Sequence, residues 1–267
     1  MKNKTILFWI IAIVITLSSA IFQRMTGPTK PYRGQVELGE SAISYRLIRS
    51  YDRPEDAPVS VQAENREITG YFIYKRYPSH DQWAKAPLER DGDRLVAYIP
   101  QQPAAGKVMY QIFLEKGDSR VMLSEEPVII RFRDSVPGWA MLPHIIFMFT
   151  AMLFSTRAGL AAIFREKTSR ITILTFTTFV LGGLIFGPIV QKYAFGDYWT
   201  GWPLGTDLTD NKTAFAFIFW LIAFIKVFKN PRHRGWVLAA SIVLLLIYLI
   251  PHSLLGSEID WTQEGVE

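Results

Sequence analysis

The sequence predicts an α-helical membrane protein with five transmembrane helices and an inserted all-β extracytoplasmic domain. Two observations predict this fold class. Five apolar runs punctuate the 267-residue chain, and the stretch 33–133 between the first two runs is instead rich in charged residues and alternates polar with apolar positions. The overall composition, 49% hydrophobic and 20% charged, is an average over these apolar runs and the charged stretch.

The first apolar run, residues 5–22, has no charged residue and follows Lys2 and Lys4. At ~1.5 Å per residue, a helix of this length approaches the ~30 Å thickness of the hydrocarbon core. The run also contains aromatic residues that are bulkier than the short apolar core of a signal peptide requires. We therefore expect residues 1–22 to be an N-terminal transmembrane anchor. A signal peptide cleaved after Ala20 is the alternative.

After a polar linker at residues 23–31, the hydrophobic period changes to two, which is typical of β-strands. A Lys116-Gly117-Asp118 turn between two alternating runs indicates a β-hairpin. About seven short strands at this spacing predict a seven-stranded β-sandwich over residues 32–136. The runs that carry this prediction are residues 41–50, 68–77, 94–100, 107–115, 121–123 and 128–133.

The segment AGKVMYQI, residues 105–112, resembles the approach to a late strand in fibronectin type III and immunoglobulin-like domains. Tyr110 lies where those domains have a tyrosine corner. The resemblance covers only the β domain, and it implies a sandwich without implying a function, because this fold hosts many. The alternative is that Tyr110 is simply a core aromatic residue.

Residues 137–267 are predicted to form a four-helix transmembrane domain, and the distribution of basic residues predicts its orientation. The predicted spans are residues 139–154, 171–190, 213–225 and 236–250. Two loops are crowded with arginine and lysine, whereas the loop 191–212 has few and the tail after residue 250 has none. The basic loops and the N-terminus are therefore expected in the cytoplasm. The β domain, the loop 191–212 and the C-terminal tail are expected in the periplasm.

Composition excludes several classes of function. The chain has no cysteine, so disulfides, thiolate metal sites and a cysteine nucleophile are ruled out. The net charge of +5 comes from basic residues beside apolar runs, which indicates membrane topology and no nucleic-acid partner. The expected partners are the lipid bilayer and other membrane proteins of the cell envelope.

Two histidines are the first candidate site residues. One Leu/Ile-Pro-His tripeptide ends at His144, where the second span begins, and another ends at His252, just after the fifth. The predicted topology places both at similar depth near the outer face. Imidazole ligates haem iron and divalent metals, so we expect His144 and His252 to bind a cofactor, with haem b or a divalent metal as candidates. Interfacial histidines satisfied by water or backbone are the alternative.

Four carboxylates on the same predicted membrane face are the second candidate set: Asp207, Asp210, Glu258 and Asp260. With histidine they would suit zinc, manganese or iron, and with Asn211 alone they would suit calcium. They come from separate segments, so a shared metal site depends on the tertiary fold. Alternatively, Asp210 is the N-cap of the fourth span.

The segments DLTDNKT and IPHSLLGSE are similar to segments of uncharacterised bacterial inner-membrane proteins, which implies an inner-membrane location and no activity. The leading hypothesis is an inner-membrane protein with a ligand-, metal- or haem-binding site on its periplasmic face. The alternative is a non-catalytic scaffold whose β-sandwich binds an envelope partner. An integral-membrane enzyme acting on lipid head groups is a third hypothesis, and no motif in the sequence identifies a reaction.

Overall fold

The computed structural model describes residues 2–252, 254–256 and 258–263, with side chains from Lys4 onward. The chain divides into two compact units. The helical unit comprises Met1–Pro28 and Val136–Ser257. The β unit comprises Thr29–Ser135 together with the tail that begins at Glu258.

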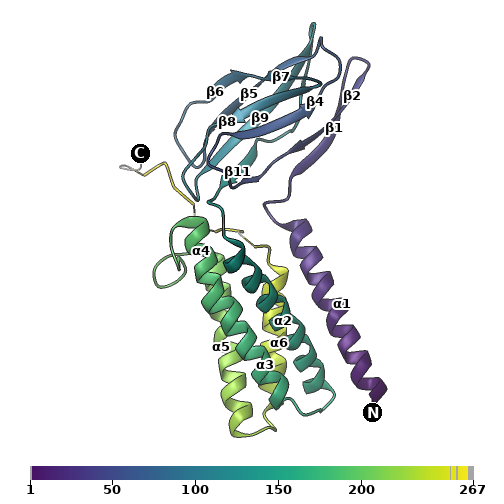
Figure 1. Cartoon of the computed structure of the whole chain (residues 1–267), viewed down its shortest axis with the longest axis vertical. Coiled ribbons are helices and arrows are strands. Elements are labelled where there is room, and N and C mark those ends of the chain that lie inside the picture. The colour runs from purple at the N-terminus through teal and green to yellow at the C-terminus, as the bar shows by residue number, and fades with distance from the viewer. Residues whose placement is uncertain (1, 253, 257, 264–267) are drawn as a thin grey trace. The chain divides into compact units, whose positions relative to one another are not determined.

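The β unit contains two sheets (Figure 1). One has the strand order β1-β2-β4-β8-β7, and the other has the order β3-β11-β9-β5-β6, with β10 also paired to β9. Within residues 29–135 there are thus eleven strands, so the expected number of seven is wrong. The strands are β1 (Tyr32–Leu38), β2 (Ser41–Leu47), β3 (Ser50–Tyr51), β4 (Ala57–Gln62), β5 (Thr69–Arg76), β6 (Ala84–Pro87), β7 (Glu89–Asp91), β8 (Arg94–Ile99), β9 (Lys107–Lys116), β10 (Ser119–Met122) and β11 (Val128–Phe132).

The core of the β unit is one hydrophobic cluster to which both sheets contribute. Strand β4 shows the pattern clearly, since Val59 and Val61 are buried while the residues between them are exposed. From the other sheet, Ile112 and Leu114 of β9 join the same cluster and are fully buried. Alternating burial follows from the pleat, which points successive side chains to opposite faces. Most strands that the sequence did not predict, namely β1, β3, β6 and β7, lie at sheet edges, where one face is not fully buried and this signal is weak. Strand β4 is different, because it lies between β2 and β8 and its alternation was overlooked.

Two local expectations in the β unit had different outcomes. The hairpin is confirmed, because β9 pairs with β10 and Gly117 has a φ of +56° in the turn, a conformation that favours glycine. The tyrosine corner is wrong. The Tyr110 hydroxyl donates to the Ile48 carbonyl at 2.9 Å, far upstream in the chain, whereas a tyrosine corner bonds a few residues away. Tyr110 is a core residue, and burial raises the pKa of its hydroxyl.

The helical unit contains a helix at each of the five predicted apolar runs (Figure 1). Four of these helices are long and apolar enough to cross a membrane, and α6 is shorter. The third run is continuous but changes to a π-helix, η1, in the middle. The helices are α1 (Lys2–Thr26), α2 (Gly138–Ile163), α3 (Ser169–Phe179), η1 (Val180–Phe186), α4 (Gly187–Phe195), α5 (Leu208–Lys229) and α6 (Arg234–Leu249).

Helix α5 begins five residues before the predicted span and has a different N-cap. The Asp207 side chain accepts hydrogen bonds from the backbone N–H groups of Thr209 at 2.7 Å and Asp210 at 3.3 Å. Asp207 is therefore the N-cap, and the expectation that Asp210 fills this role is wrong. The cause is the polar stretch 208–212, which lowers the mean hydropathy of this part of the sequence although it already belongs to the helix.

Close packing holds the helical unit together. Its core contains many alanines, together with Trp220, which is fully buried. Small residues let helix backbones approach closely. One close approach involves η1: a Cβ atom on Gly182 would lie 2.9 Å from the sulfur and 3.0 Å from the backbone nitrogen of Met148 on α2. This contact fixes the position of η1 against α2, and it lies beside the site described next.

Candidate ligand pocket

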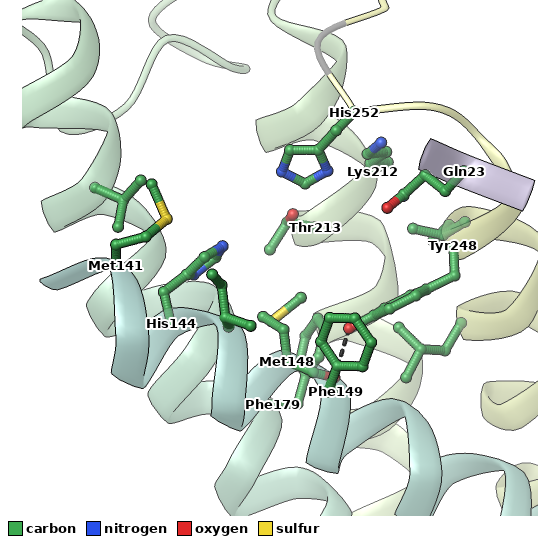
Figure 2. Close-up of a pocket in the computed structure, with 14 residues that line it drawn as sticks. Gln23, Met141, His144, Met148, Phe149, Phe179, Lys212, Thr213, Tyr248 and His252 are labelled. Carbon is green, nitrogen blue, oxygen red and sulfur yellow. Dashed lines mark hydrogen bonds between the residues drawn. The ribbon is translucent and has the colours of Figure 1, made fainter. Parts of the chain in front are cut away.

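A pocket of about 270 Å³ lies within the helical unit, where the end of α1, the start of α2 and the end of α6 meet (Figure 2). Its walls are mostly apolar, and its polar groups come from different helices. The lining residues are Gln23, Met141, His144, Ile145, Met148, Phe149, Phe179, Val190, Lys212, Thr213, Leu244, Ile247, Tyr248 and His252. Both predicted histidines are among them, although 108 positions separate them in the sequence numbering.

His144 lies one and a half turns into α2, and its ring is oriented by the π-helix. Its Nδ1 is 2.9 Å from the carbonyl oxygen of Gly182. Because a carbonyl oxygen can only accept, Nδ1 carries the proton in this bond. In the neutral ring, Nε2 then has the free lone pair, which is the arrangement used by histidines that bind metals or accept protons. π-Helical turns are frequent at functional sites, and here the turn presents the carbonyl that fixes His144.

His252 follows the end of α6, and Figure 2 shows its ring turned into the pocket, above Thr213 and beside Lys212. His252 keeps exposed surface and also lines the pocket. Loss of hydration in the pocket lowers the pKa of the imidazole below its ordinary value, and the positive charge of Lys212 lowers it further. The ring is therefore neutral near pH 7 and can donate one hydrogen bond and accept another.

Lys212 is a buried cation in the first turns of α5, with only 8% of its surface exposed. Its Nζ donates to the backbone carbonyls of Ile250 at 3.1 Å and Pro251 at 3.4 Å. Gln23 on α1 also donates to the Ile250 carbonyl, at 3.3 Å. Carbonyls at the end of a helix have no intrahelical partner, so these two side chains satisfy the end of α6. They also bring α1, α5 and α6 together around His252.

The pocket therefore combines a polar end with an apolar interior. Lys212, His252 and Gln23 lie at the helix ends, whereas Met148, Phe149 and other apolar side chains form the deeper wall (Figure 2). The hydroxyl of Tyr248 is already used, since it donates to the Met148 carbonyl at 2.5 Å. Pockets that bind small molecules have this composition: apolar walls and a few polar groups that fix orientation.

Asp207 and Asp210 lie outside the pocket lining and have structural contacts. Asp207 caps α5, as described above. One carboxylate oxygen of Asp210 accepts four hydrogen bonds, two of them from the backbone N–H groups of Thr200 at 2.6 Å and Gly201 at 3.0 Å. The other two come from the Thr200 hydroxyl at 3.3 Å and from Gln191 Nε2 at 3.0 Å. Asp210 thus holds the connection between α4 and α5 in place.

Glu258 and Asp260 belong to the β unit rather than to the helical unit. Glu258 forms an ion pair with Lys107 on β9, and the next residue, Ile259, donates its N–H to the Ala105 carbonyl at 3.4 Å. The Asp260 carboxylate accepts from the Thr262 hydroxyl at 2.6 Å, which lowers its pKa. The described tail residues, 258–263, thus make contacts with the β unit or with one another, and neither carboxylate lines the histidine pocket.

The described residues contain no group of three or more histidine or carboxylate side chains that could hold a metal ion. The structure brings His144 and His252 to one pocket and leaves the four carboxylates outside its lining. It adds Lys212 and Gln23, which sequence reasoning missed. A lysine next to Asp207 and Asp210 at the start of an apolar run resembles an ordinary interfacial charge, and nothing local indicates its burial.

Comparison with protein-family models, with curated protein sequences and with solved structures finds no match to this chain.

Proposed function

We propose that this protein is an integral membrane protein with five spans, whose two sheets form a β-sandwich on the periplasmic face of a bacterial inner membrane. Four helices have the length and apolarity for a span. Helix α6, with 16 residues, reaches ~24 Å at ~1.5 Å per residue, and Ile250 and Pro251 extend it toward the interface. The single hydrophobic cluster to which both sheets contribute supports the sandwich.

The direction of the helices supports this topology. One pocket and the contacts around it draw residues from five helix ends. These are the ends of α1, α4 and α6 and the starts of α2 and α5. At the other end, Phe8 near the start of α1 stacks on Phe164, just after α2, with ring centroids 4.6 Å apart. Successive helices therefore alternate in direction, as five spans require. The basic loops after α2 and α5 favour the cytoplasm for the end with Phe8.

Reporter fusions test the topology. Fusions after Arg133, after Val190 and at the C-terminus should report the periplasm, and fusions after Phe164 and Lys229 should report the cytoplasm. The physical reason is that arginine and lysine beside a span are retained on the cytoplasmic side. A reporter that is active only in the cytoplasm, paired with one active only in the periplasm, gives a positive signal at each site. A cytoplasmic C-terminus would contradict the five-span count.

The function that this geometry supports best is binding of a small ligand in the pocket that contains His144 and His252. The observation that carries the proposal is that two histidines 108 positions apart in the sequence line one cavity. The Nδ1 of His144 is already bonded, and its Nε2 is left for a ligand. A metal ion or haem is one form of such a ligand, because imidazole Nε2 ligates both. An organic molecule held by hydrogen bonds is the other form.

Substitution of the histidines tests this function. Protein purified in a mild uncharged detergent should retain a bound small molecule or ion, and His144→Ala and His252→Ala should each reduce its occupancy by roughly tenfold, equivalent to ~1.4 kcal/mol. Mass spectrometry of the extracted ligand, metal analysis and the absorbance spectrum identify its class. His233→Ala is the matched control, because His233 lies in the loop before α6 and its Nδ1 contacts the Lys226 carbonyl. Equal occupancy in all variants would reject the pocket as the ligand site.

A further inference from the structure

The electrostatics of the pocket narrow down the ligand. One lysine and two histidines are among its lining residues, and none of the fourteen lining residues is acidic. Lys212 is nearly fully buried, and its hydrogen bonds to Ile250 and Pro251 are to neutral carbonyls. The nearby negative charge that acts on Lys212 is Asp207, which caps α5 and does not line the pocket. A buried charge loses much of its hydration, and an opposite charge held nearby offsets this loss. The polar end of the pocket therefore favours an anionic group and disfavours a metal cation.

The other walls favour an apolar chain or ring attached to that group. Below the polar end lie Met148, Phe149 and Phe179 (Figure 2). Leu244 and Ile247 also line the pocket. Burial of apolar area there contributes about 25 cal/mol per Å². Free inorganic anions would leave these walls without a partner, so the composition of the pocket fits an amphipathic molecule.

The position of the pocket indicates how such a molecule enters. Ile145 and Phe149 line the pocket, and 41% of each is exposed. Their neighbours on α2, Leu142 and Ile146, are 60% and 59% exposed. This part of α2 thus presents a continuous apolar surface, which in a membrane faces hydrocarbon. The pocket is next to lipid at the level of Ile145 and Phe149.

We infer that the ligand of this pocket is a lipid-soluble acid, an apolar chain that ends in a carboxylate or a phosphate, and that it enters from the bilayer past Ile145 and Phe149. The inference rests on the ligand-binding function proposed above. The anionic oxygens lie against Lys212 and the N–H of His252, and the chain lies along Met148 and Phe179. Charge-assisted hydrogen bonds to a buried ammonium group give the acid its advantage over a neutral lipid.

Direct binding measurements on the full-length protein in an uncharged detergent test this inference. The probes are radiolabelled dodecanoic acid and dodecyl phosphate at pH 8, with dodecanol as the neutral analogue and inorganic phosphate as a competitor. Both acids should bind at least roughly tenfold more tightly than dodecanol, which corresponds to ~1.4 kcal/mol. Lys212→Met should remove this preference, and Lys212→Arg should retain it. Lys192→Met is the matched control, because Lys192 also donates to a backbone carbonyl, that of Gly196, but does not line the pocket.

A second variant covers the case in which Lys212→Met fails to fold. Ile145→Trp narrows the pocket from the lipid side without touching Lys212, and it should weaken binding of both acids. If dodecanol binds as tightly as the acids, the acidic head group is wrong, while a ligand pocket stands. If His144→Ala, His252→Ala and Ile145→Trp all leave binding unchanged, the proposed pocket itself fails. Displacement of dodecyl phosphate by equimolar inorganic phosphate would assign the site to free phosphate and overturn the lipid.

Discussion

Replacing Gly182 with leucine is expected to destabilise the helical unit by about 1–3 kcal/mol, the range for overpacking a close contact. A Cβ atom at this position would lie 2.9–3.0 Å from three atoms of Met148, and one of them is the backbone nitrogen. A flexible sulfur can move away, but the backbone of α2 cannot move without shifting the helix. The change should also lengthen the bond between His144 Nδ1 and the Gly182 carbonyl, because both partners lie at the contact.

Thermal unfolding in detergent measures this effect. About 2–4 °C of midpoint is lost per kcal/mol in a protein of this size class, so Gly182→Leu should lower the midpoint by about 5 °C. The matched control is Gly235→Leu, since Gly235 lies in the first turn of α6 and a Cβ atom there meets nothing within 4 Å. Its midpoint should stay within about a degree of the wild type. Equal losses in the two variants would contradict a specific effect of the contact with Met148, because leucine is a better helix former than glycine and propensity alone would favour both substitutions.

Replacing Asp210 with alanine is expected to release the connection between α4 and α5. One oxygen of this carboxylate accepts from two backbone N–H groups, one hydroxyl and one amide, and Asp210 is 5% exposed. Each buried donor left without a partner costs about 1–3 kcal/mol, so the loss should reach about 3 kcal/mol even if water reaches some of the donors. Asp210→Asn keeps an acceptor oxygen and should fall between alanine and the wild type.

Limited proteolysis and tryptophan fluorescence measure this release, because Trp199 and Trp202 lie in the connection. Cleavage between α4 and α5 should become faster in Asp210→Ala, and the emission maximum should change. Asp197→Ala is the control, since Asp197 belongs to the same connection and is exposed. If Asp210 instead serves mainly as a metal ligand, chelators should speed cleavage of the wild type as much as the substitution does, which would contradict the structural role.

The features that sequence alone could predict are those that depend on local periodicity. The alternation of Ile43, Tyr45 and Leu47 predicted a strand whose side chains alternate between core and surface, and β2 has this pattern. The two histidines could be proposed as a pair because each lies beside a proline at an end of an apolar run. The ends of the apolar runs indicate how deep in the membrane a residue lies, and both histidines were expected near the outer face. Residues at the same depth on different helices are candidates for contact.

The features that sequence could not predict depend on distant partners. The burial of Lys212 requires the carbonyls of Ile250 and Pro251, which follow α6 and lie 38 and 39 positions further along the chain. Asp207 and Asp210 differ by three positions, yet the backbone of Thr200 and Gly201 decides that one caps a helix and the other holds a loop. Glu258 was grouped with them by predicted topology, whereas Lys107 holds it on the β unit.

The π-helix makes the orientation of α4 depend on the number of residues in the third apolar segment. In η1, the N–H of Gly187 bonds the carbonyl of Gly182, five residues earlier, so this turn contains one residue more than a regular α-helix. Each residue turns an α-helix by ~100°, so α4 is rotated by this angle relative to a straight continuation of α3. Val190 reaches the pocket and Gln191 reaches Asp210 in that rotated phase. The number of residues in Val180–Phe186 is therefore constrained independently of the close packing at Gly182, because the loss of one residue would turn α4 away from both partners.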